Sequence, residues 1–82
     1  MSGQARFDFK GRLKADSFVE FARHRAARLS LAIKVGQAND DAITLQVWGA
    51  AELVDAFEMA CSLGPYDCVV LDVARHDREL AA

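Results

Sequence analysis

The residues best suited to chemistry lie in a short polar segment, Phe9–Val19, between two different sequence patterns. Before it, aromatic and charged residues alternate over Arg6–Lys10, which is typical of a β-strand with one buried face. After it, Ser17 precedes Glu20 by three positions, the spacing of a capping box at the start of a helix. Such a junction can bind an anion, because free backbone N–H groups and the positive end of the helix dipole meet there.

The bulk composition describes one small folded domain. With 82 residues, 52% hydrophobic and 27% charged, the chain resembles a globular domain and not a disordered one. A net charge of -2 offers no overall positive field, so no nucleic-acid partner is expected. The first residues, 1–4, are unlike a secretory leader, and no segment reaches the roughly 20 apolar residues that span a bilayer. The sequence therefore predicts a cytoplasmic protein without a membrane partner.

The cysteines and histidines do not form a recognisable metal or redox motif. Cys61 and Cys68 have apolar neighbours and are expected to be buried, reduced thiols. His24 and His76 are far apart in the sequence and are expected at the surface, so no metal site is predicted. Ser17 is interpreted as a helix cap and not as a nucleophile.

Hydrophobic periodicity sets the expected elements. Strands are predicted over 5–13, 31–35, 42–48 and 68–73, and helices over 17–29 and from about 50 to Gly64-Pro65. The order βαββαβ predicts a ferredoxin-like two-layer α+β sandwich, with a four-stranded antiparallel sheet and two helices on one face. The whole chain is expected to form one domain, with a core over about 5–74 and a charged tail over 75–82.

Several short features, taken in order, resemble the acylphosphatase family over about Phe9–Val73. They are Gly11-Arg12-Leu13-Lys14, Phe18, Ala27-Arg28-Leu29-Ser30-Leu31, Val35, Asp40, Gly49, Phe57 and Gly64-Pro65. The resemblance implies hydrolysis of acyl phosphates without a metal or cofactor. In that family a loop after the first strand wraps the phosphate in N–H groups, an arginine holds the anion, and an asparagine orients the attacking water.

The resemblance places two substitutions at these catalytic positions: Val19 stands for the arginine and Gln37 for the asparagine. Valine has neither charge nor donor, and glutamine would shift a bound water by about an ångström, which can reduce the rate on the order of 10²-fold. The positions that match the phosphate loop are Lys14, Ala15, Asp16, Ser17 and Phe18. Asp16 adds a negative charge where the phosphate would bind.

These residues and the resemblance are compatible with three functions. The favoured hypothesis is an acylphosphatase-like domain without efficient catalysis, acting as a module that binds a small anionic ligand or a protein partner. A divergent acylphosphatase is the alternative, in which Arg12, Lys14 or Arg23 replaces the missing arginine. An RNA-binding domain of the same strand order is the third, but Phe7 and Phe9 are expected in the core and not on an exposed stacking face.

Overall fold

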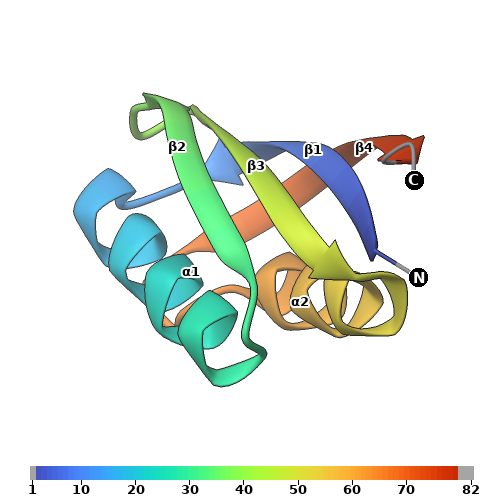
Figure 1. Cartoon of the computed structure of the whole chain (residues 1–82). Helices are drawn as coiled ribbons and strands as arrows, with labels where there is room; N and C mark the ends of the chain where they lie inside the picture. The colour runs from blue at the N-terminus through green and yellow to red at the C-terminus, as the bar shows by residue number, and fades with distance from the viewer. Residues whose placement is uncertain (1, 80–82) are drawn as a thin grey trace.

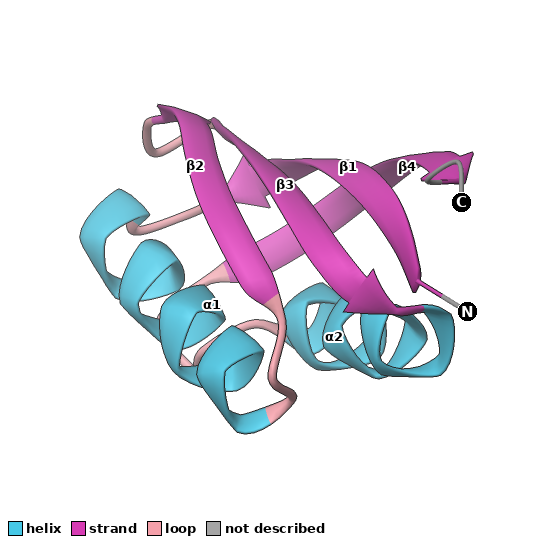
Figure 2. Ribbon diagram, viewed as in Figure 1, coloured by secondary structure: helices cyan, strands magenta, loops and turns pink. Residues whose placement is uncertain are grey.

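The computed structural model describes residues 2–79 and has the predicted element order. The elements are β1 (Ser2–Arg12), α1 (Ala15–Arg28), β2 (Ala32–Ala38), β3 (Ala42–Ala50), α2 (Ala51–Leu63) and β4 (Val69–Glu79). The strands form one antiparallel sheet in the order β2-β3-β1-β4. Both helices lie on one side of this sheet (Figures 1 and 2), which confirms the ferredoxin-like fold.

The core is built on the inward side chains of β1. Phe7 and Phe9 are fully buried, as the alternation along this strand predicts. The ring of Phe9 lies 5.0 Å from that of Phe18 in α1, and the ring of Phe7 lies 5.8 Å from that of Phe57 in α2. Each helix is thus anchored to the same strand by an aromatic pair. Because these rings are buried, they do not form an exposed base-stacking surface.

The predicted burial of the cysteines and exposure of the histidines are confirmed. Cys61 and Cys68 are both free and buried. The side chains of His24 and His76 are largely exposed. Within residues 2–79, no helix combines the length and the apolar character needed to cross a membrane.

The predicted end of the last strand is wrong. β4 does not stop at Val73 but continues to Glu79, so the expected tail over 75–82 is strand as far as Glu79. The remaining positions of that expected tail, 80–82, lie outside the described residues. The extension pairs with β1 along its whole length and ends with Glu79 opposite Gly3.

Arg75 explains why a charged sequence continues as an inward-facing strand. It pairs with Phe7 in the sheet, and its guanidinium lies 5.5 Å from the centre of that ring. It also binds Glu58 and Asp55 of α2, the latter at 2.9 Å, and Asp77 of its own strand at 2.6 Å. The positive charge of Arg75 and the three carboxylates therefore lie together at the edge of the core. They occupy a place where an apolar side chain would be expected from the alternation of the strand.

A β-bulge shapes the end of β1 that leads into the candidate site. Lys10 pairs with Asp72 and Gly11 with Val70, which leaves Leu71 as the extra residue of β4. Gly11 has a φ of +157°, and a Cβ atom there would lie 2.1 Å from the carbonyl oxygen of Val69. Only glycine fits this close backbone approach.

Candidate functional site

The junction between β1 and α1 is shorter than the sequence predicted. Only Leu13 and Lys14 separate the two elements, so the expected loop residues from Ala15 onward form the first helical turn. The prediction that Ser17 caps α1 is wrong: the N-cap is Lys14, and no side chain of the N-cap residue bonds the helix. Because the helix begins earlier, the Ser17 hydroxyl is free to donate to Asp67 Oδ1 at 2.8 Å.

Other parts of the chain already bind the N–H groups at this junction. Asp40 Oδ1 accepts a hydrogen bond from the N–H of Ala15 at 3.1 Å, and the Asp40 carbonyl accepts one from Leu13 at 2.8 Å. The N–H of Lys14 lies 3.3 Å from the sulfur of Cys68, a buried thiol. A helix leaves four N–H groups without an internal partner, and two of them here, those of Asp16 and Ser17, have no partner among residues 2–79.

The β2–β3 hairpin holds Asp40 in this capping position. Asn39 Oδ1 accepts hydrogen bonds from the N–H groups of Asp41 at 2.8 Å and Ala42 at 2.9 Å, which closes a tight turn. The carbonyl of Asp41 accepts the N–H of Gly11 at 3.2 Å. The sequence alone does not indicate that Asp40 caps α1. An aspartate in a turn indicates a polar bend but not which distant helix it reaches.

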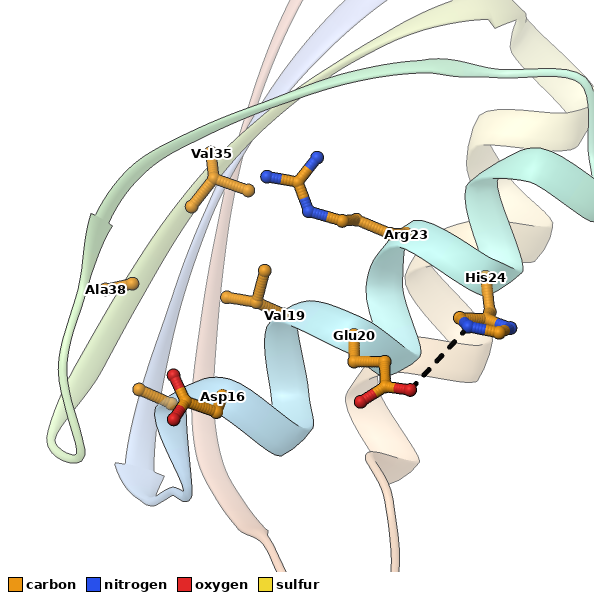
Figure 3. Close-up of a pocket in the computed structure, with 8 residues that line it drawn as sticks. Asp16, Val19, Glu20, Arg23, His24, Val35 and Ala38 are labelled. Atoms are coloured by element: carbon orange, nitrogen blue, oxygen red, sulfur yellow. Dashed lines mark ion pairs between the residues drawn. The ribbon is translucent and has the colours of Figure 1, made fainter.

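Beside this junction lies an open hollow of about 460 Å³ between α1 and β2 (Figure 3). Its lining residues are Ala15, Asp16, Val19, Glu20, Arg23, His24, Val35 and Ala38. Val19 therefore contributes an apolar wall, at the position that the sequence resemblance matches to the arginine of the acylphosphatase family. The charges on the lining are mixed, and His24 lies 3.8 Å from Glu20. The hollow has no concentration of positive charge that would favour phosphate.

Gln37 is not among the residues that line the hollow. Val35 pairs with Leu45 and Ala38 with Ile43, so the strand contains an irregularity at Gly36 and Gln37. Ala38 consequently lines the hollow together with Val35, while Gln37 is exposed. A bulge re-aims side chains in this way, and sequence alternation does not reveal it.

The three basic residues considered as replacements for the arginine differ in position. Arg12 and Lys14 are exposed and are not among the lining residues, whereas Arg23 is. In Figure 3, Arg23 extends toward Val35, and Val19 lies between it and Asp16 at the start of the helix. The structure thus places one cation in the hollow, displaced toward the β2 side.

Comparison with models of known protein families and with curated proteins finds no match to this sequence. Solved structures do match. The acylphosphatase from Bacillus subtilis superposes with a TM-score of 0.87 at 22% identity, covering 99% of this chain and 89% of that one. An acylphosphatase from Coxiella burnetii gives 0.86 at 17% identity, covering 99% and 85%.

A third match comes from a much longer protein. Full-length HypF, in its phosphate- and nucleotide-bound form, superposes with a TM-score of 0.84 at 17% identity over 98% of this chain. The matched part is 11% of the HypF chain. Together with the element order and sheet topology, these similarities show that the chain has an acylphosphatase-like fold.

Proposed function

We propose that this acylphosphatase-like domain does not hydrolyse acyl phosphates efficiently and serves as a small binding or interaction module. The observation that carries the proposal is the hydrogen bond from the Ala15 N–H to the Asp40 carboxylate. A negative group of the chain itself occupies the end of α1 at which the fold would offer N–H groups to a phosphate. The free Cys61 and Cys68 are in keeping with a cytoplasmic location.

Electrostatics around this helix end oppose a second anion. A phosphate oxygen about 4 Å from a carboxylate is repelled by ~4 kcal/mol at the effective dielectric of a protein surface. Asp40 and the exposed Asp16 both lie at this end of the helix. The two N–H groups that remain there, those of Asp16 and Ser17, offset this repulsion only in part.

The catalytic positions support the same proposal. Val19 offers the hollow neither a charge nor a donor, so the two parallel hydrogen bonds of an arginine to a phosphate are absent. Loss of one such donor commonly raises the barrier by several kcal/mol. The exposed Gln37 does not line the hollow and so is poorly placed to orient a water there. Both requirements of the reaction, anion stabilisation and a positioned water, are weakened together.

A divergent acylphosphatase is the second candidate, and the observation that favours it is Arg23. This side chain lines the hollow one helical turn after Val19. If Arg23 carries out the role of the missing arginine, replacing it with glutamine abolishes the activity. If the first proposal is correct, the same replacement changes nothing.

The test is hydrolysis of acetyl phosphate, compared with the spontaneous rate. We expect the wild type to be no faster than the spontaneous reaction. Val19→Arg is expected to gain activity on the order of 10²-fold at most, because Asp16 and Asp40 remain, and adding Gln37→Asn should change little, because position 37 lies outside the hollow. Ala38→Arg is the matched control, since it adds an arginine to the same hollow from β2. Wild-type hydrolysis that Arg23→Gln abolishes would instead establish the second candidate.

A further inference from the structure

The outer edge of β4 differs from the opposite edge of the sheet. β2 is a seven-residue edge strand interrupted at Gly36 and Gln37. β4 has eleven residues, and after its bulge at Leu71 it follows β1 in regular register from Asp72 to Glu79. Among residues 2–79, no strand pairs with its outer side. A long regular edge presents a row of backbone donors and acceptors that another strand can use.

Exposed apolar side chains gather along the same edge. Five large ones are exposed in the described part of the chain, and all fall within thirteen consecutive residues: Met59, Leu63, Tyr66, Val69 and Leu71. Val69 and Leu71 belong to β4. Met59 and Leu63 line a shallow hollow on α2 together with Asp55 and Glu58, the two residues that bind Arg75 of β4. Val69 pairs with Arg12 and so lies on the uncovered face of the sheet, whereas Met59 and Leu63 belong to α2 on the other face. Exposed apolar side chains therefore flank the β4 edge on both faces.

We propose that this edge, β4 with the adjoining flank of α2, binds a second copy of the chain by antiparallel β4–β4 pairing. Two copies related by a two-fold axis perpendicular to the sheet would form one continuous eight-stranded sheet, with all four helices on the same side. The exposed α2 flanks of the two copies would then face each other across the axis. This inference is independent of whether the hollow beside α1 has any activity.

The side chains of β4 favour one register for this pairing. With Ala74 on the axis, Asp72 of each copy lies opposite His76 of the other, and His76 can donate a hydrogen bond to that carboxylate. Both side chains are on the uncovered face of the sheet, as their pairing with Lys10 and Arg6 of β1 shows. An axis at Asp72 or Arg75 would instead place like charges directly opposite each other, which is destabilising.

Ala74 is also the midpoint of β4, so this register gives regular pairing over 72–76 and places the bulged segment 69–71 opposite 77–79. Its small side chain leaves room at the axis for the partner's Ala74. Strand pairing alone gives a small interface, and the apolar side chains of α2 add to it, so we expect a dimer with a dissociation constant in the micromolar range.

The experiment is sedimentation velocity over the micromolar range with three chains. The wild type is expected to approach twice the 9.0 kDa mass of the chain. Ala74→Lys places two ammonium groups at the axis and is expected to weaken association by about tenfold or more. The added lysine should not destabilise the folded monomer, because position 74 lies opposite Asp8 in the sheet. Ala32→Lys is the matched control: it adds the same charge to an exposed position of the other edge strand and should still dimerise.

A charge exchange tests the register. His76→Asp sets two carboxylates opposite each other and should weaken the dimer, and adding Asp72→Lys should restore it. Circular dichroism and urea unfolding confirm that each variant is folded. A wild type that is monomeric at every concentration overturns the proposal, and so does equal loss of association in the Ala32→Lys control. A double variant no tighter than His76→Asp alone overturns the proposed register.

Discussion

Asp40 caps a helix that begins 25 residues before it in the chain: its Oδ1 accepts the N–H of Ala15 at 3.1 Å. The carbonyl of the same residue accepts the N–H of Leu13 at 2.8 Å. The β2–β3 turn and the start of α1 are therefore joined by one residue. Because the cap is a carboxylate, we expect the bond that stabilises the helix also to disfavour anions at its end.

Removing this cap should affect stability and phosphate binding in opposite directions. Asp40→Ala is expected to lower the free energy of unfolding by about 1 kcal/mol, the usual effect of losing a helix cap. Asp40→Asn keeps an acceptor for Ala15 and should lose less. Urea unfolding measures both, with Asp41→Asn as the control on the neighbouring carboxylate.

The expected gain in phosphate binding on removing Asp40 can be measured with inorganic phosphate. Phosphate should stabilise Asp40→Ala against urea more than it stabilises the wild type, because the Ala15 N–H becomes available and one negative charge is gone. Sulfate should act similarly, and sodium chloride at equal ionic strength serves as the control. Equal stabilisation of both proteins would show that Asp40 does not block the helix end.

Arg75 should contribute far more to stability than another arginine of the same sheet. Burial alone lowers the pKa of Arg75, but hydrogen bonds with Glu58, Asp77 and Asp55 outweigh it, so the net pKa is raised and the charge persists at any working pH. Arg75→Met is expected to lower the free energy of unfolding by about 2 kcal/mol, because it leaves three carboxylates without their partner.

Arg6→Met is the control for this substitution. The Arg6 guanidinium lies 3.5 Å from Asp8 Oδ1, and the Arg6 side chain is 55% exposed, so solvent screens this ion pair. The expected loss is about 0.5 kcal/mol. Equal losses in the two variants, measured by urea unfolding, would contradict the role assigned to Arg75.

Gly11→Ala should be among the most destabilising single substitutions in the chain. The added Cβ would lie 2.1 Å from the carbonyl oxygen of Val69 and 2.9 Å from the backbone nitrogen of Leu71, and backbone atoms cannot yield as side chains do. We expect a loss of about 3 kcal/mol or more in thermal or urea unfolding. Gly36→Ala is the control, because its Cβ meets Thr44 only at ordinary contact distances of 3.5–3.7 Å. A small effect at Gly11 would argue against the bulge at Leu71.

Stability should fall at alkaline pH because of Cys61. Burial raises the pKa of this thiol from 9.0 to about 12, with a smaller opposing effect of Arg25. Below pH 9.0 the Cys61 thiol keeps its proton in both the folded and the unfolded chain, so it does not lower the free energy of unfolding. Between 9.0 and about 12 only the unfolded chain releases the proton, which lowers the free energy of unfolding by up to about 1.4 kcal/mol per pH unit.

This slope can be isolated by comparing variants. Cys61→Ala is less stable at neutral pH because it leaves a small cavity, but it lacks the Cys61 contribution to the slope above pH 9.0. Burial also raises the pKa of Cys68, but less than that of Cys61, so Cys68→Ala removes a smaller contribution and retains that of Cys61. Urea unfolding at a series of alkaline pH values should therefore give a shallower slope for Cys61→Ala. Parallel slopes in the two variants would contradict the assignment.

Much of the fold could be predicted from the sequence because its signals are local. The alternation over Arg6–Lys10 places Phe7 and Phe9 in the core, and the stripe along α2 places Phe57 there. These patterns repeat within one element, so they require no knowledge of its partners. The same is true of the end of α2, where Gly64 takes a positive φ of 68°.

The parts that could not be predicted depend on residues far apart in the sequence. Arg75 belongs to a strand only because Asp55 and Glu58 of α2 neutralise it, and no alternation of apolar residues indicates this. The cap of α1 comes from the distant hairpin, so Ser17 was the more obvious candidate. At Gln37 the alternation is broken by a bulge, which moves the neighbouring Ala38 into the hollow instead.

The pairing of Gly3 with Glu79 determines how the domain responds to a mechanical load. The first and last strands lie side by side and antiparallel (Figure 1). Gly3 and Glu79 therefore face each other at one end of the β1–β4 ladder. A force that separates them acts along the hydrogen bonds and loads the pair at the end of the ladder first. The bonds then break in succession and do not share the force. When force is applied to Gly3 and Glu79, we expect β4 to separate from β1 one residue pair after another. This edge strand, which Arg75 holds against α2, should therefore be the first element to detach.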